Sequence, residues 1–82
     1  MDLSKFRLRV NAIVMWHYLE EQSSHGITDH IINYADIDRK HGISKHRQVQ
    51  GLNELERCNL IIQKKAEGNQ KHKVYSINES ML

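Results

Sequence analysis

The sequence of 82 residues predicts a mostly helical α+β fold in which three helices precede a basic β-hairpin. Three observations support this prediction. Apolar residues recur at helical spacing near the N-terminus, capping signals flank a glycine in mid-chain, and two runs rich in β-branched and aromatic residues follow. A chain of this length predicts a single domain, residues 1–82, with a small core.

The first predicted helix runs from Leu3 to Gln22. Two apolar stripes lie along it at helical spacing: Phe6, Val10, Ile13 and His17 on one, and Leu8, Ala12, Met15, Trp16 and Leu19 on the other. Two stripes indicate a helix that packs on more than one side. Gly26 breaks the pattern, and Ile27 to Ile32 fits either a short strand or a loop.

The second predicted helix runs from Tyr34 to His41. Asn33 is its expected N-cap, and the carboxylate of Asp36 falls in the first turn, where it favours the exposed N–H groups. Gly42 follows as a C′ residue in the left-handed conformation.

The third predicted helix runs from Lys45 to Cys58 and has Ser44 as its N-cap. The residues expected to face the core are Val49, Leu52 and Leu55, with Gln48 as a further candidate. Asn59 is expected to end the helix in the left-handed conformation. Two predicted strands, 60–66 and 71–77, then form a hairpin around a loop with Gly68 and Asn69.

The net charge of +2 is unevenly distributed. Residues 1–38 carry a net charge of −3, residues 39–73 carry +6, and the last nine residues carry −1. A concentrated basic region is typical of proteins that bind polyanions, although an ordinary solvated face has the same composition. The longest apolar run, Ala12–Trp16, is too short for a membrane span. The first ten residues lack the pattern of a secretory signal, and there is a single cysteine, so a cytoplasmic location is expected.

The order and spacing of these elements resemble the winged helix-turn-helix superfamily of DNA-binding domains. The phrases "INYADIDRKHGIS", "GLNELERCNLI" and "KVYSI" carry the resemblance, which covers Ile32 to Ile77; the first predicted helix fits the usual first helix. The resemblance implies a role for each of these residues: Ile37 in the core, Gly42 at the turn, Ile43 as its apolar plug, Ser44 as cap, Leu52 and Leu55 on the core side, and Leu60, Ile61, Tyr75 and Ile77 in the wing. In size the chain is similar to small MarR-like, phage and plasmid regulators, and to the DNA-binding parts of replication initiators.

Two positions depart from the family pattern. Asp38 stands where a small residue is usual, and Gln48 stands where Val or Ile is usual. Because a buried, unpaired Asp would be costly, we expect Asp38 to pair with Gln48, Arg47 or Lys45. The alternative is a recognition helix rotated to bury Val49. Gly51 is expected where two helices approach closely.

The resemblance implies that the third helix enters the major groove of double-stranded DNA. Its front carries the predicted contacts Ser44, Lys45, His46, Arg47, Gln48 and Gln50. Arg47 matches guanine, and Gln48 or Gln50 matches adenine, through paired hydrogen bonds. Ser44 and Lys45 suit phosphates. The alternative to DNA contact is that these side chains form an ordinary solvated helix face.

The hairpin is the second predicted contact surface. Its predicted DNA-binding residues are Lys64, Lys65, Asn69, Gln70, Lys71 and Lys73. Lysines there attract DNA through counterion release, and they also protect an exposed strand edge from aggregation. Arg39 and Lys40 are candidate backbone contacts, and Arg7 and Arg9 could also reach phosphates.

Met15, Trp16 and Leu19 are the predicted dimerisation residues, because the first helix carries more apolar side chains than one stripe needs in so small a protein. Two copies commonly read palindromic half-sites. The six histidines are scattered and no CxxC or HxxxH pair occurs, so no metal and no cofactor is expected. No catalytic motif stands out, so an enzyme is not expected. The predicted function is sequence-specific DNA binding by a transcriptional regulator, most simply a repressor. The alternatives are a phage or plasmid replication or partition factor and a winged helix that binds another protein.

Overall fold

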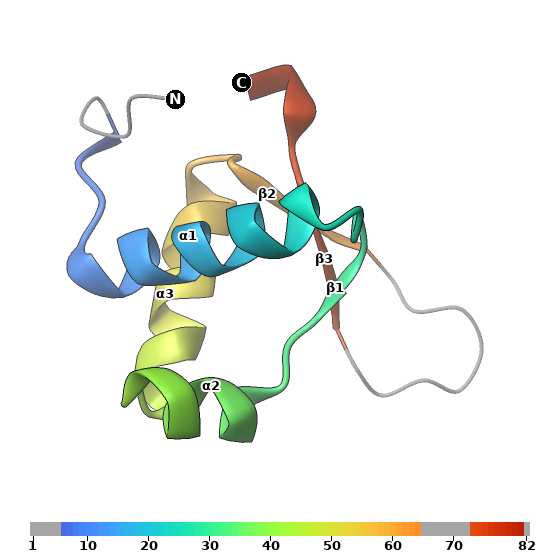
Figure 1. Ribbon diagram of the computed structural model, residues 1–82. Helices are drawn as coiled ribbons and strands as arrows, with labels where there is room; N and C mark the ends of the chain where they lie inside the picture. The colour runs from blue at the N-terminus through green and yellow to red at the C-terminus, as the bar shows by residue number, and fades with distance from the viewer. Residues whose placement is uncertain (1–5, 65–72, 82) are drawn as a thin grey trace.

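The computed structural model describes residues 6–64 and 73–81 and has a mostly helical α+β fold (Figure 1). Three α-helices pack with a small three-stranded antiparallel sheet. The elements in chain order are α1 Val10–Ser24, β1 His30–Ile31, α2 Tyr34–His41, α3 Lys45–Arg57, β2 Ile61–Lys64, β3 Val74–Ile77 and the 3₁₀ helix η2 Glu79–Met81. The predicted α+β class is confirmed.

The sheet has the order β1-β3-β2, so that β3 lies between two antiparallel neighbours. Tyr75 of β3 is opposite His30 of β1 and Gln63 of β2. The stretch 27–32, whose sequence fits either a strand or a loop, contains the two-residue strand β1, which a short connection joins to α2. Both predicted hairpin strands are present, although β2 begins at Ile61 and β3 begins at Val74.

The first helix is shorter at its start than the sequence predicts. It begins at Val10 and not at Leu3, and it ends at Ser24 and not at Gln22. Arg7 has a left-handed φ of 51°, and Arg9 is extended, so the backbone before Val10 cannot continue a helix. The predicted residues Leu3 to Lys5 lie outside the described part of the chain.

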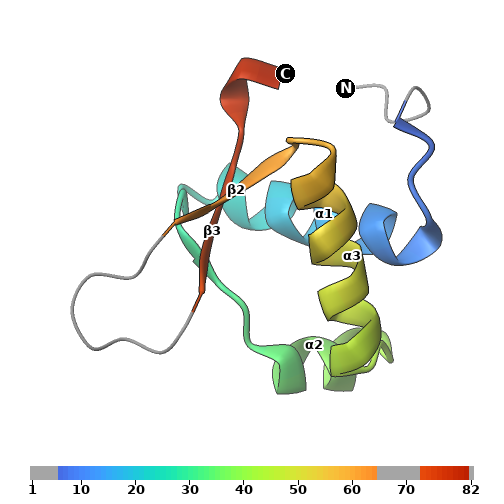
Figure 2. The same cartoon turned by 180° about the vertical axis from the view of Figure 1, so that it is seen from behind.

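Only one of the two predicted stripes of α1 is buried. Ala12, Met15, Trp16 and Leu19 are in the core, whereas Val10 is 74% exposed and His17 is exposed. Phe6 and Ile13, on the same stripe as Val10, are half-buried, and Phe6 packs against the core. The prediction of burial on two sides is therefore confirmed only in part. Helix α1 crosses α3 on one side (Figures 1 and 2).

Gly51 lies where α1 and α3 cross, as predicted. A Cβ atom at this position would lie 2.5 Å from the backbone oxygen of Asn11. Two backbones can approach this closely only where a side chain is missing. The core around this crossing is completed by residues from every layer: Ile32, Ile37, Leu52, Leu55, Leu60, Ile61 and Tyr75.

The predicted helix ends in the middle of the chain are confirmed. Asn33 accepts a hydrogen bond from the N–H of Asp36 at 3.1 Å, and Ser44 accepts one from Arg47 at 3.4 Å. Gly42 and Asn59 are left-handed, with φ of 68° and 60°. Helix α3 ends at Arg57, so the half-buried thiol of Cys58 lies at the cap position and not inside the helix.

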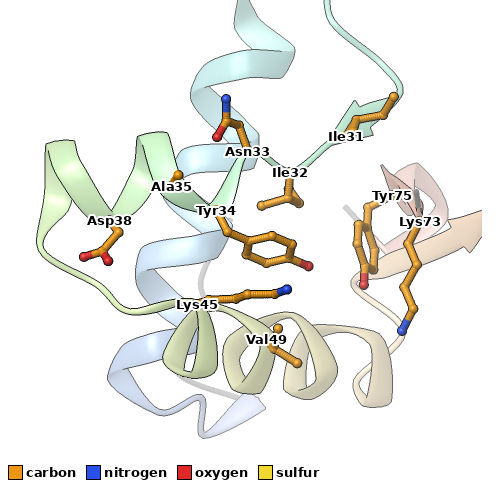
Figure 3. A pocket seen from close by; sticks show the side chains of 10 residues that line it. All are labelled: Ile31, Ile32, Asn33, Tyr34, Ala35, Asp38, Lys45, Val49, Lys73 and Tyr75. Carbon is orange, nitrogen blue, oxygen red and sulfur yellow. The ribbon is translucent and has the colours of Figure 1, made fainter. Parts of the chain in front are cut away.

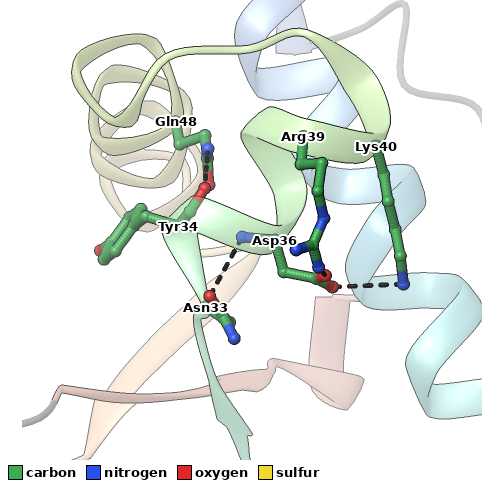
Figure 4. Close-up of polar contacts among 6 residues, drawn as sticks. All are labelled: Asn33, Tyr34, Asp36, Arg39, Lys40 and Gln48. Carbon is green, nitrogen blue, oxygen red and sulfur yellow. Dashed lines mark hydrogen bonds and ion pairs between the residues drawn. The ribbon is translucent and has the colours of Figure 1, made fainter.

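Gln48 is fully buried and sets the rotation of α3. Its side-chain amide donates to the backbone oxygen of Tyr34, at 2.9 Å (Figure 4), and to that of Ile43, at 2.8 Å. It thus ties α3 to the start of α2 and to the turn between the helices. Its own oxygen has no hydrogen-bond partner among the described residues.

The predicted pairing of Asp38 is wrong. Asp38 is exposed, and its carboxylate forms no hydrogen bond or ion pair with the part of the chain that the structure describes. The alternative rotation is wrong as well, because Val49 is only half-buried while Gln48 is fully buried. An exposed Asp38 needs no partner, since its charge remains in water.

Candidate nucleic-acid interface

Helix α3 presents a continuous polar face to solvent. Its buried face consists of Gln48, Gly51, Leu52 and Leu55. With 3.6 residues per turn, the opposite face carries another set of side chains, all exposed: His46, Gln50, Asn53 and Arg57. The polar face therefore extends along all 13 residues of α3.

Most of the predicted contacts at the front of α3 are exposed. Lys45, His46, Arg47 and Gln50 all reach solvent, as does Ser44 at the cap. Gln48 does not, and its assignment as a base contact is wrong. The buried amide is used inside the fold, where its N–H groups are bonded to two backbone oxygens.

Two hydrogen bonds position the exposed amide of Gln50. It contacts the ring of His46 one turn earlier, with 3.2 Å between the two nitrogens. Its oxygen accepts a hydrogen bond from the side chain of Asn11 on α1 at 3.5 Å. These contacts limit the directions in which Gln50 can present its amide, which favours a specific partner over a freely rotating side chain.

A second cationic cluster lies beside the far end of α3. Arg7, Arg9 and Arg57 surround a hollow of about 450 Å³ together with Asn53 and Glu54. Glu54 accepts a hydrogen bond from the backbone N–H of Arg9 at 3.2 Å, which fixes the chain entering α1 against α3. Asn53 and Arg57 were not among the predicted contacts. They lie on the same helical stripe as His46 and Gln50, so their spacing in the sequence could have identified them.

The described part of the predicted wing contributes two lysines. Lys73 is exposed, and so is Lys64, although its ammonium forms an ion pair with Asp29 at 2.9 Å. The other predicted wing contacts lie outside the described residues: Lys65, Asn69, Gln70 and Lys71.

Arg39 and Lys40 are exposed but share one carboxylate. Both contact Asp36, with 3.2 Å between Lys40 and its carboxylate (Figure 4). The hydrogen bonds from Lys40 and then Arg39 lower the pKa of the Asp36 carboxyl. Part of the positive charge at the end of α2 is thus neutralised within the helix.

The predicted dimerisation residues are unavailable for a partner. Met15, Trp16 and Leu19 are at most 1% exposed, because this face of α1 packs against α3. Their assignment to a dimer surface is wrong.

The described residues 6–64 and 73–81 contain no group of three or more potential metal ligands. None of their helices has the length and apolar character needed to cross a membrane.

Comparison with known proteins adds no assignment. The chain matches no family model, no curated protein and no solved structure.

Proposed function

We propose that the chain is a winged helix-turn-helix domain that binds double-stranded DNA, with α3 in the major groove. The observation that carries this proposal is the exposed polar face of α3. A major groove about 12 Å wide accepts an α-helix, and base edges there offer hydrogen-bonding patterns that Arg and Gln side chains match. The order β1-β3-β2 and the capped turn between α2 and α3 are consistent with this family.

The side chains of the polar face divide into two roles. Arg47, Gln50 and Arg57 supply donors for base edges, and Lys45 lies at the helix N-terminus, where phosphates are favoured. Lys73 extends the cationic surface to β3. The proposed cellular role is transcriptional regulation in the cytoplasm, with repression by occupation of an operator. We expect two copies to bind one palindromic site, and a measurement of the protein-to-DNA stoichiometry tests this.

Fluorescence anisotropy with duplexes recovered from a genomic pull-down tests this proposal. Wild-type protein should prefer the recovered site over a random duplex, and Gln50→Ala should reduce that preference by about 1–3 kcal/mol. The matched control is Gln63→Ala, which removes an exposed amide from β2 and should leave the preference unchanged. A folded protein that binds no duplex at low salt would contradict the proposal and favour a protein partner.

A further inference from the structure

Three arginines border the hollow of about 450 Å³ between the segment that precedes α1 and the second half of α3. Arg7 and Arg9 come from that segment, and Arg57 comes from the end of α3. This site, the arginine hollow, adjoins the polar face of α3, because Gln50, Asn53 and Arg57 belong to both. Of the three arginines, the contacts proposed for base edges use only Arg57. The convergence of Arg7 and Arg9 on the same hollow is therefore unexplained by them.

Backbone contacts hold the two walls of the arginine hollow in place. At the crossing of α1 and α3, Gly51 lets Asn11 approach so closely that an added Cβ atom would lie 2.5 Å from the backbone oxygen of Asn11. Three residues further along α3, Glu54 accepts a hydrogen bond from the backbone N–H of Arg9 at 3.2 Å. Arg7 has a left-handed φ of 51°, which turns the chain ahead of Arg9. The walls are thus positioned before a ligand arrives, which reduces the entropy lost on binding.

The arginine hollow carries an excess of positive charge. Its lining has three guanidinium groups against one carboxylate, that of Glu54. None of the three arginines forms an ion pair with a carboxylate of residues 6–64 or 73–81. The Glu54 carboxylate is half-buried and is bonded to the backbone of Arg9. Within this part of the chain, the guanidinium groups therefore keep their donors available for an anion from solution.

The lining favours a compact, highly charged anion over one with an apolar body. Besides the charged residues, the described lining consists of the amide side chains of Asn11, Gln50 and Asn53. It differs in this from the wider groove between α2, α3 and the sheet, which is lined in part by Tyr34 and Val49 (Figure 3). Arginine binds phosphate oxygens through two parallel N–H···O bonds, and amide N–H groups supply further donors. A phosphate group has several acceptor oxygens and no apolar surface, so it matches this lining.

We propose that the arginine hollow binds phosphate groups, held between Arg7 and Arg9 on one wall and Arg57 on the other. Its volume of about 450 Å³ equals that of about fifteen waters at about 30 Å³ each, which is enough for a phosphodiester with part of its sugars or for a short chain of phosphates. Two sources supply this chemistry: the backbone of a duplex whose major groove holds α3, and a free polyphosphate. The duplex as source rests on the proposed function, whereas the phosphate site does not.

Isothermal titration of the full chain with sodium triphosphate, at constant ionic strength, tests the free source. If a free polyphosphate is the ligand, binding is saturable and Arg9→Gln weakens it by about tenfold. This variant keeps the backbone N–H that Glu54 accepts, so the wall itself stays in place. The matched control is Arg47→Gln, which removes the same charge from the front of α3 and should change the affinity by less than about twofold. Far-UV circular dichroism verifies that each variant is folded.

Anisotropy titrations with a set of modified duplexes test the backbone as source. Each duplex carries the site recovered by genomic pull-down, with one phosphate replaced by an uncharged methylphosphonate. If a backbone phosphate occupies the hollow, its replacement weakens binding of the wild-type protein by about tenfold. In Arg9→Gln the replacement at that position loses its effect, while replacements elsewhere keep theirs. In Arg47→Gln the effect at that position remains.

Either result, triphosphate binding that depends on Arg9 or one phosphate position whose effect depends on Arg9, supports the site and identifies its source. The proposal is overturned if Arg9→Gln matches Arg47→Gln in both experiments, or if the protein binds neither triphosphate nor duplex. Arg9-dependent binding of triphosphate by a chain that binds no duplex would refute the proposed function and retain the site. Duplex binding with neither effect of Arg9→Gln would refute the site and retain the function.

Discussion

Replacing Gly51 by Ala tests the close crossing of α1 and α3. The added Cβ atom would lie 2.5 Å from the oxygen and 2.8 Å from the carbonyl carbon of Asn11, and 3.1 Å from the nitrogen of Ala12. All three are backbone atoms of α1, so no side chain can rotate out of the way. Ordinary contact begins at 3.4 Å, which means that the helices must separate by about 0.9 Å.

The expected cost follows from two opposing effects. Forcing an extra carbon into a packed interface costs about 1–3 kcal/mol, and the upper end applies because only backbone is available to move. Alanine has a helix propensity about 1 kcal/mol better than glycine, which offsets part of this cost. The net loss should be about 2 kcal/mol, from a total stability of about 4–12 kcal/mol for a chain of this length.

Urea denaturation followed by tryptophan fluorescence measures this loss. Trp16 is the only tryptophan of the chain and is 1% exposed, so it reports directly on the opening of the core around α1. In thermal unfolding the same loss should lower Tm by about 8–16 °C. Asn53→Ala, at an exposed position of the same helix, is the control and should stay within about 0.5 kcal/mol of wild type. A Gly51→Ala variant as stable as wild type would refute the packing argument.

The remaining predictions concern the turn, the buried amide and the buried histidine. Gly42→Ala should lower the free energy of unfolding by about 1 kcal/mol, because its φ of 68° is left-handed. A steric clash does not contribute, since no atom lies within 4 Å of the added Cβ. Gln48→Met should cost about 1–3 kcal/mol, since two backbone oxygens lose their donor, and it should leave the preference among DNA sites unchanged in anisotropy titrations. Burial lowers the pKa of His30 from 6.5 despite the opposing effect of Asp29, so the native state resists its protonation. The contribution of neutral His30 to the free energy of unfolding should therefore be fully present above pH 6.5. It should decrease as the pH falls below 6.5, by at most about 1.4 kcal/mol per pH unit. In His30→Gln the free energy of unfolding, measured by urea denaturation, should depend less on pH below 6.5. An equally steep pH dependence in the variant would contradict the assignment.

The features that depend on local chemistry could be predicted from the sequence. Asn33, Gly42, Ser44 and Asn59 act through neighbours within one helical turn, so their roles follow from residue type and spacing. The close approach at Gly51 also follows, because glycine within an otherwise helical pattern indicates a contact that excludes a side chain.

The features that depend on tertiary contacts could not be predicted. Apolar spacing cannot distinguish a position packed on another helix from one that is left in solvent, so the stripe containing Val10 does not reveal that Val10 is 74% exposed. The sequence makes Gln48 a candidate both for the core-facing side of the helix and for a base contact, and only the positions of the Tyr34 and Ile43 backbone oxygens decide for burial. Asn53 and Arg57 differ from these cases, because they share a helical stripe with His46 and Gln50 and the spacing in the sequence was enough to place them on the polar face.

The salt dependence of DNA binding tests the proposed function most directly. Anisotropy titrations of a labelled duplex between about 50 and 200 mM salt should give an affinity that falls linearly on logarithmic axes, because lysines and arginines release counterions from phosphates. Lys45→Gln should reduce that slope by about one unit, and Gln50→Ala should leave the slope unchanged while reducing site preference. Folded wild-type protein that shows no binding at the lowest salt, or binding whose strength does not depend on salt, would contradict the account.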